Sequence, residues 1–233
     1  MRKLLLGAIT GAVMLAVAAI AMAATDTTYS QKYTSPKVST SVGTNFSTTS
    51  IDNENTAGNN QPAAAREVDI TFPKGTLINQ TAAPFCKNLD ESADNPCPTK
   101  TKIGGGSAEV RLKFNGTAPI PASVTAYNRK GGLFLYVVPS VQGQAPVVLK
   151  PVFKGITLVT KIAPLCVLND CATNGEAVLT KFKLNTKAIK KGTKTFIKSP
   201  AKCPKAGWQF IGTFKYDAPT PVKKLSSLQK CKK

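Results

Sequence analysis

The sequence of 233 residues predicts an all-β protein: an antiparallel β-sandwich, immunoglobulin-like or jelly-roll-like, with local disulfides. Three observations lead to this fold. After residue 66, many short segments alternate apolar and polar residues with a period of two. Turn-forming residues separate these segments, and we find no amphipathic helix longer than about two turns. A barrel laced with disulfides is the nearest alternative.

The chain is expected to begin with a secretory signal peptide over residues 1–23. Arg2 and Lys3 precede an uncharged apolar stretch that ends at Ala24, and Ala21-Met22-Ala23 fits the rule for cleavage between small residues. An uncleaved anchor is the alternative, because the stretch approaches the roughly 20 residues that span a bilayer. After cleavage we expect no transmembrane segment, and a protein that is secreted or non-covalently attached to the outer cell surface.

The mature chain is expected to have two parts. Residues 24–65 are rich in Ser, Thr and Asn, which predicts a partly flexible N-terminal segment with at most one irregular strand. Residues 66–233 carry the regular alternation and are predicted to form the β-sandwich domain. The overall composition, 42% hydrophobic and 18% charged, is that of a globular protein.

The alternation predicts individual strands. Val68, Ile70 and Phe72 alternate with polar residues, and Ala108–Phe114 does the same after the run Gly104-Gly105-Gly106, which we interpret as a turn or bulge. Further strands are predicted at Ala122–Tyr127, Leu133–Val138, Pro146–Leu149, Ile156–Lys161, Ala177–Leu184 and Thr193–Ile197.

The last predicted strand, Trp208–Tyr216, has the clearest pattern, and the chain then turns back through Val222–Leu228 as a hairpin. Four aromatic residues share one face of this strand. Such a face is usually the inner face of a sandwich and only rarely a platform on which bases stack, so nucleic acid is not an expected partner. The four residues are Trp208, Phe210, Phe214 and Tyr216.

All six cysteines follow the predicted signal peptide, and an even number in an exported chain favours disulfides. Many connectivities are possible. The order along the chain favours three local pairs: Cys86–Cys97, Cys166–Cys171 and Cys203–Cys231. A zinc site is disfavoured, because the sequence has neither a Cys-x-x-Cys motif nor a histidine. We expect no metal and no other cofactor.

Positive charge is concentrated in the C-terminal third. The formal net charge is +19, and residues 150–233 hold 18 lysines against three acids. Lysine attracts phosphates and carboxylates as a point charge, which predicts loose, salt-dependent contact with an anionic polymer. The alternative is a solvated basic face that keeps the protein soluble. The lysines expected to make the contact are Lys187, Lys190, Lys191, Lys194, Lys198, Lys223, Lys224, Lys230, Lys232 and Lys233.

Catalytic motifs are missing from the sequence. The lack of histidine excludes Ser-His-Asp and Cys-His arrangements. Glu67 and Asp69 would lie on one strand face and are the candidate carboxylate pair of a hydrolase, although solvent-facing acids are commoner. Asp90 and Asp94 have the spacing of calcium ligands without the turn glycine and final glutamate of an EF-hand. We therefore expect no catalytic residue and no enzyme.

Several segments resemble those of exported, mostly actinobacterial proteins of uncharacterised function. The most specific runs from Ser199-Pro200-Ala201-Lys202-Cys203-Pro204 through Trp208-Gln209-Phe210 and Phe214-Lys215-Tyr216 to Cys231-Lys232-Lys233. Together with Thr71–Thr76, Cys97–Ala108 and Gly131–Tyr136, the resemblance spans most of residues 66–233. It implies an exported β-sandwich with no assigned activity, so it transfers no catalytic residue.

The sequence thus predicts a non-enzymatic exported protein that associates with the cell envelope, or another anionic polymer, through a lysine-rich face. Cell-wall polymers and lipid headgroups are the expected partners, ahead of nucleic acid. Two alternatives remain open: a hydrolase of envelope polysaccharide, and a secreted module that binds an apolar ligand between its sheets. The oligomeric state is also left open.

Overall fold

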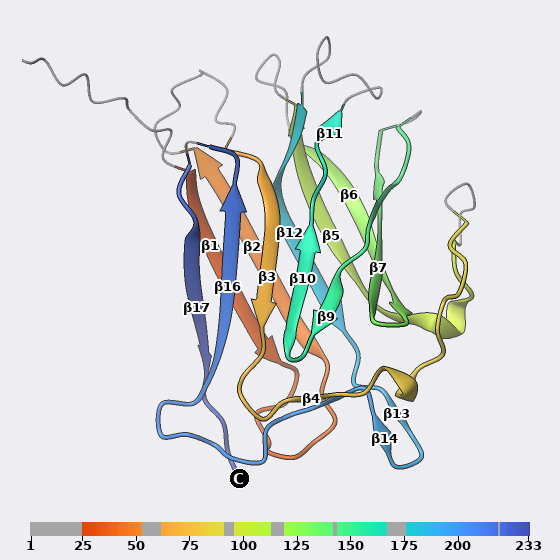
Figure 1. The fold of residues 1–233 in the computed structure, drawn as a ribbon, viewed down its shortest axis with the longest axis vertical. Coiled ribbons are helices and arrows are strands. Elements are labelled where there is room, and N and C mark those ends of the chain that lie inside the picture. The colour runs from red at the N-terminus through yellow and green to blue at the C-terminus, as the bar shows by residue number, and fades with distance from the viewer. Residues whose placement is uncertain are drawn as a thin grey trace, which may run out of the picture.

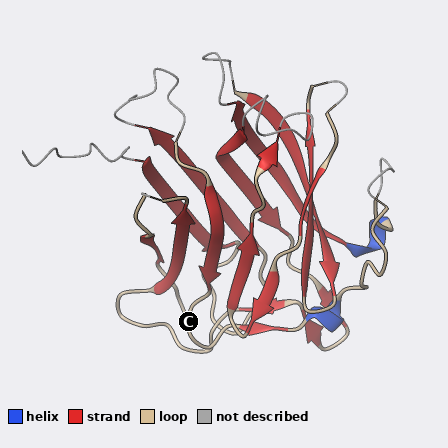
Figure 2. Cartoon of the chain, turned by 45° about the horizontal axis from the view of Figure 1, so that its top comes forward, coloured by secondary structure: helices blue, strands red, loops and turns tan. Residues whose placement is uncertain are grey.

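The computed structural model describes residues 25–52, 62–90, 96–112, 119–141, 144–166, 176–218 and 220–233. Within these residues the fold is almost entirely antiparallel β-sheet, and the helices are two single 3-10 turns, Gln80–Ala82 and Thr99–Thr101 (Figure 2). The predicted all-β antiparallel class with local disulfides is confirmed.

Most strands belong to one large sheet, in the order β1-β2-β12-β5-β6-β7-β9-β10-β3-β16-β17, with β8 added to β7 and β11 added to β12. Two small two-stranded pairs, β13-β14 and β15-β4, lie outside it. The bounds are β1 Thr25–Tyr33, β2 Thr44–Asp52, β3 Ala65–Thr71, β4 Leu77–Ile78, β5 Lys102–Leu112, β6 Ile120–Arg129, β7 Gly132–Pro139, β8 Val147–Leu149, β9 Val152–Lys154, β10 Thr157–Lys161, β11 Leu165–Cys166, β12 Glu176–Thr186, β13 Lys190–Lys191, β14 Lys194–Thr195, β15 Ile197–Lys198, β16 Trp208–Tyr216 and β17 Lys223–Gln229.

The large sheet folds over into two facing layers, with β9, β10, β3, β16 and β17 in front of β1, β2, β12, β5 and β6 (Figure 1). Its first and last strands, β1 and β17, lie side by side, so the sheet is nearly closed into a barrel. Side chains help to join this seam. Ser227 Oγ accepts from the Gln31 N–H at 3.1 Å and donates to the Gln31 carbonyl at 2.8 Å. The Gln229 amide bonds to the Tyr33 backbone in the same way.

The N-terminal segment differs from the prediction. It contains two regular strands rather than one irregular strand, and β1 and β2 pair over their full length, from Thr25 opposite Asp52 to Tyr33 opposite Thr44. Their Thr and Ser side chains suit a pleated surface, and alternate residues of β1 are buried against the rest of the protein. Residues 66–233 therefore do not form the sheet alone. The Asn-rich part of the segment, residues 53–61, lies outside the described residues.

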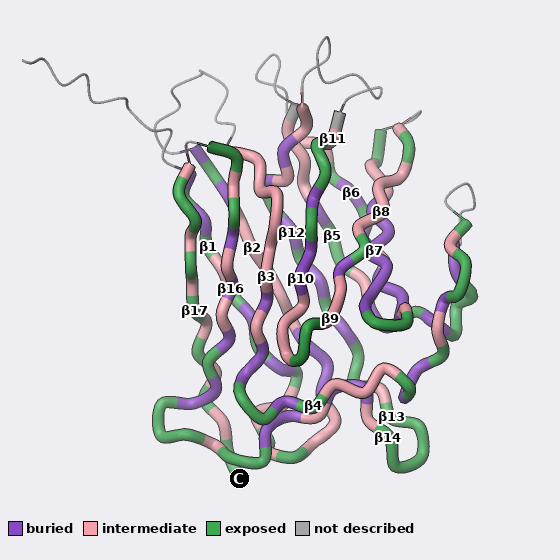
Figure 3. Tube along the Cα trace, viewed as in Figure 1, coloured by how far each residue is buried: buried purple, intermediate pink, exposed green. Residues whose placement is uncertain are grey.

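Buried residues alternate with less buried ones along β16 (Figure 3), and its aromatic face is the buried one, as predicted. Trp208, Phe210 and Phe214 are at most 2% exposed. The Tyr33 ring meets Trp208 and Phe210 edge-on, with centroids 5.3 Å and 4.8 Å apart. Such pairs add about 0.5–1.5 kcal/mol each beyond their buried area. Because these three rings are buried, they cannot stack on nucleic-acid bases.

The glycine run lies inside a strand rather than in a turn before it. β5 begins at Lys102, ahead of the predicted start at Ala108, and a Cβ at Gly106 would lie 1.8 Å from the Lys183 carbonyl oxygen on β12. Only glycine permits two backbones to approach so closely. The register of the pairing with β6 shifts between Lys102 and Gly104, where the glycine run begins.

The predicted strand Thr193–Ile197 is interrupted. β14 ends at Thr195 and pairs with β13, whereas β15 starts at Ile197 and pairs with β4. The N–H of Phe196, between them, donates to the Ile189 carbonyl at 2.9 Å. The residues with the alternating pattern therefore form two short strands, which pair with two different partner strands.

Two predicted disulfides lie within the described residues, and both are formed. The Cα atoms are 5.6 Å apart in Cys86–Cys97 and 5.7 Å apart in Cys203–Cys231. The predicted Cys166–Cys171 pair lies outside the described side chains.

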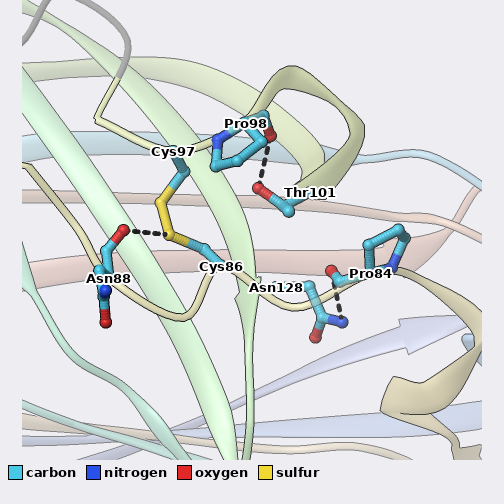
Figure 4. The surroundings of a disulfide bond; sticks show 7 residues. All are labelled: Pro84, Cys86, Asn88, Cys97, Pro98, Thr101 and Asn128. Carbon is cyan, nitrogen blue, oxygen red and sulfur yellow. Dashed lines mark hydrogen bonds between the residues drawn. A yellow bond between two sulfur atoms is a disulfide. The ribbon is translucent and has the colours of Figure 1, made fainter.

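The Cys86–Cys97 bond lies beside a buried amide, Asn128 (Figure 4). Asn128 Nδ2 donates to the carbonyls of Ala83 at 2.9 Å and Pro84 at 3.2 Å. The Cys86 N–H in turn donates to the Asn128 carbonyl at 2.8 Å. These bonds hold the disulfide-containing loop against β6.

Candidate functional site

Lysines from separate parts of the chain gather at one end of the sheet, at the bottom of Figure 1. This end is formed by residues 34–43, 72–79, 187–207 and 230–233, and we call it the basic end. These segments contain no acidic residue. They contain twelve lysines: Lys37, Lys74, Lys187, Lys190, Lys191, Lys194, Lys198, Lys202, Lys205, Lys230, Lys232 and Lys233.

The β13-β14 hairpin places lysines opposite one another. Lys191 pairs directly with Lys194 across the hairpin, and Lys190 lies next to this pair. All three are exposed. Like charges directly opposite in a sheet are destabilising, and residues 187–207 contain no carboxylate to offset them. The hairpin therefore presents concentrated positive charge to the solvent.

The C-terminus forms a second lysine pair. Lys232 and Lys37 are bridge partners. The Val38 N–H donates to the Lys232 carbonyl at 3.2 Å, and the Lys232 N–H donates to the Pro36 carbonyl at 2.9 Å. Backbone hydrogen bonds thus hold together two lysines that are nearly 200 positions apart in the sequence.

Buried Ser199 fixes the segment between these two pairs. Its Oγ donates to the Lys37 carbonyl at 2.7 Å, and its N–H donates to the Thr40 carbonyl at 3.0 Å. The Val42 N–H donates to the Ile197 carbonyl at 3.0 Å. The backbone segments that contain Lys37 and Lys198 are therefore hydrogen-bonded to each other.

The Cys203–Cys231 disulfide attaches the C-terminus to the turn before β16. Trp208 Nε1 donates to the Lys202 carbonyl at 2.9 Å within that turn. Gly207 has a φ of +97°, and a Cβ there would lie 2.4 Å from the Gln229 carbonyl oxygen, so the tight approach requires glycine.

The structure divides the ten predicted lysines between the two ends of the sheet. Eight lie at the basic end, but Lys223 and Lys224 lie at the opposite end of β17, where Lys223 Nζ donates to the Thr25 carbonyl. Sequence reasoning missed four lysines of the basic end. Lys202 and Lys205 flank Cys203, so the predicted disulfide could have indicated them. Lys37 and Lys74 come from distant segments and carry no local signal.

The candidate carboxylate pair lies on the outward face of β3. Lys215 Nζ bonds to Glu67 and lies 3.7 Å from Asp69 Oδ2. The hydrogen bond from Lys215 holds the pKa of Glu67 below its ordinary value. A general acid of a glycosidase needs a raised pKa. The geometry therefore gives the hydrolase alternative no support.

Glu67 and Asp69 line neither of two hollows formed by the described residues. A polar groove of about 410 Å³, which sequence reasoning missed, includes Asp52, Glu109 and Lys181. Lys181 Nζ lies 3.0 Å from Glu109 Oε2, so these two charges largely offset one another. A narrower apolar cavity of about 90 Å³ lies between the two layers of the sheet.

In the described part of the chain, no group of three or more His, Cys, Asp or Glu residues could hold a metal ion. The calcium candidate, Asp90 to Asp94, lies mostly outside that part. None of the described helices has the length and apolar character that a bilayer crossing requires.

Comparisons with known proteins give no match to a protein-family model, to a curated protein or to a solved structure. The resemblance to exported actinobacterial proteins and the signal peptide at residues 1–23 stay predictions.

Proposed function

We propose that the protein associates with the cell envelope by binding anionic polymers or lipid headgroups through its basic end. The observation that carries this proposal is the meeting of lysine with lysine, Lys191 with Lys194 and Lys37 with Lys232, in segments without acids. Both arrangements cost stability through repulsion, and an external anion would relieve that cost.

The chemistry of the site favours a polymer over a small anion. Its charges are lysines, which act as point charges rather than as the planar fork with which arginine recognises one phosphate or carboxylate. They come from several segments spread over one end of the molecule (Figure 1). Many weak contacts along a chain of anionic groups suit such a surface, and their sum falls steeply with salt.

The test is sedimentation of the protein with isolated cell-envelope material across a salt series, with duplex DNA as a second polyanion. The main variant changes Lys187, Lys190, Lys191 and Lys194 to Gln. The matched control changes four exposed lysines on strands away from the basic end to Gln: Lys161, Lys181, Lys183 and Lys224.

We expect the basic-end variant to lose at least tenfold in envelope binding at low salt, while the control, with the same net charge, loses little. Envelope binding should exceed DNA binding and fade with salt. An equal loss in both variants would mean that net charge alone is responsible. Equal binding to DNA, or no binding to either, would reduce the lysines to a general attraction for anions or to a solubility feature.

A further inference from the structure

The apolar cavity of about 90 Å³ is bounded by both layers of the sheet. Val68, Ile70 and Leu158 line it from the β3-β10 layer, and Leu179 and Leu184 line it from β12 in the facing layer. Voids larger than a water molecule are few in protein interiors, and apolar ones stay dry. An aliphatic group placed there would therefore gain contacts without displacing bound water.

The cavity is long and slender. Its lining residues extend from Val68 to Phe72 on β3 and from Leu179 to Thr186 on β12. At about 3.3 Å per residue, these spans correspond to roughly 13 and 23 Å of strand. A volume of about 90 Å³ distributed along that length makes the cavity narrow and leaves no room for a ring system.

Four of the five polar side chains at its wall form hydrogen bonds within the protein. The Thr44 and Thr186 hydroxyls are 3.1 Å apart, and Gln31 Oε1 accepts from the Tyr29 hydroxyl at 2.9 Å. Thr48 Oγ1 donates to the Thr28 carbonyl at 2.9 Å. A ligand at this wall therefore needs apolar contact rather than hydrogen-bonding groups.

Arg66 lies next to the end of the cavity that is opposite the basic end. Its guanidinium bonds to Glu176 at the start of β12, with Nη2 2.7 Å from Glu176 Oε2, and also bonds to Asp217 after β16. β3 and β12 are not neighbours in the sheet, so the Arg66–Glu176 ion pair crosses from one layer to the other. The N–H of Ile162, which lines the cavity, donates to the Arg66 carbonyl at 2.8 Å, so this bridge lies directly beside the cavity.

We propose that this cavity is a binding site for a slender, unbranched aliphatic chain, which enters at the Arg66 end when the ion pair to Glu176 opens. The Arg66 and Glu176 side chains are 25% and 20% exposed, so they stand at the boundary between solvent and the interior. Segments of the basic end contribute only buried apolar side chains to the lining, namely Phe72, Phe196 and Ile197, so the site requires no charge on the ligand.

Neutral 1-alkanols from butanol to decanol are the probes, because the lysines do not attract them. The full chain, produced in a secreting host and purified as that host exports it, is titrated by calorimetry and by thermal unfolding. We expect affinity to rise roughly fourfold per added methylene until the channel is filled and then to level off. A rise in Tm should follow the same order.

Two filling variants locate the site. Val68→Phe and Leu158→Phe each place a ring in the cavity, and each should weaken decanol binding at least tenfold. If one of them fails to fold, the other still tests the proposal, because the two residues lie on different strands of the lining.

A third variant tests the entrance. Glu176→Gln removes one carboxylate from Arg66 and should speed decanol association several-fold. The matched control is Glu109→Gln, which loosens the Lys181 pair on the outer surface and should leave the rate unchanged. Failure of both the native protein and Glu176→Gln to bind any alkanol would overturn the proposal. Unaltered binding in both filling variants would do so as well.

Discussion

At the basic end, twelve lysines meet without a single Asp or Glu side chain, and backbone hydrogen bonds and a disulfide hold the segments together. At the opposite end, Asp26, Asp52, Glu176 and Asp217 lie at strand termini, and Arg66 bonds to two of them. We call this second region the carboxylate end. Arg66 thus offsets two of these carboxylates within the fold, whereas the charges of the basic end are left facing solvent.

The difference indicates how each end is stabilised. Repulsion between exposed lysines acts within about 8 Å at physiological ionic strength, so neighbouring lysines raise the free energy of the folded protein. Uncharged and covalent bonds must then hold the basic end, as the Cys203–Cys231 disulfide and the Ser199 hydrogen bonds do. At the carboxylate end, ion pairs take this role. Variants at the two ends separate these two means of stabilisation.

The largest effect is expected from removing the disulfide of the basic end. Cys203→Ser with Cys231→Ser opens a loop with a sequence separation of 28 and should lower the free energy of unfolding by about 3.6 kcal/mol. Urea unfolding measures it. Hydrogen exchange should increase most in residues 34–43. The control, Cys86→Ser with Cys97→Ser, should lower the free energy of unfolding by about 2.8 kcal/mol without faster exchange in residues 34–43. Faster exchange there in the control would contradict the role given to the Cys203–Cys231 disulfide.

Arg66→Met should give the next largest effect, at the carboxylate end. Glu176 and Asp217 lose their shared cation, and we expect a loss of about 2 kcal/mol in the free energy of unfolding, since hydrogen bonds to charged groups are stronger than neutral ones. Lys181→Met removes a more exposed ion pair and should cost less than about 1 kcal/mol. If urea unfolding gives equal losses, the carboxylate end does not depend on Arg66.

Neutralising the basic end should have the opposite sign. Changing Lys187, Lys190, Lys191 and Lys194 to Gln removes repulsion and should raise the free energy of unfolding by about 0.5 kcal/mol at low salt. The gain should vanish in about 1 M salt, where the Debye length is near 3 Å. A loss of stability in this variant would mean that these lysines make stabilising contacts within the protein.

The smallest expected effect is the pH dependence contributed by Glu67, on the outward face of β3. Because its pKa is lowered by Lys215, Glu67 contributes stability above the ordinary value of 4.5, and this contribution is lost as the pH falls through the lowered pKa. Glu67→Gln should therefore reduce the fall of Tm in the acid range while leaving the neutral-pH slope unchanged. If Tm falls equally in the variant and in the native protein as the pH is lowered, the Glu67–Lys215 pair contributes nothing measurable to stability.

Local patterns predicted much of the fold. The strand at Trp208–Tyr216 has the predicted bounds, and Ala177–Leu184 lies within β12. A period of two places alternate side chains on one face whatever the partner strand, so the pattern survives in the tertiary structure. Cysteine order likewise predicted the Cys203–Cys231 bond, because a hairpin centred near residue 217 brings its two ends together.

Where the sequence reasoning was wrong, the deciding contacts were distant in sequence. The Ser- and Thr-rich residues 25–52 form two strands because β12 and β17 flank them. The run Gly104-Gly105-Gly106 belongs to β5 because β12 approaches its backbone closely. The local composition gives no information about these partner strands. It therefore favoured flexibility for the N-terminal segment and a turn for the glycine run.

The sequence by itself determined the all-β class, the inward aromatic face of β16, two local disulfides and the excess of lysine in the C-terminal third. Only the tertiary structure decided how the charges are grouped. It added Lys37 and Lys74 to the basic end, placed Lys223 and Lys224 at the far end of β17, and set Arg66 across the two layers from Glu176. Alternation and spacing act over neighbouring residues, whereas the grouping of charges depends on which strands the closing sheet brings together.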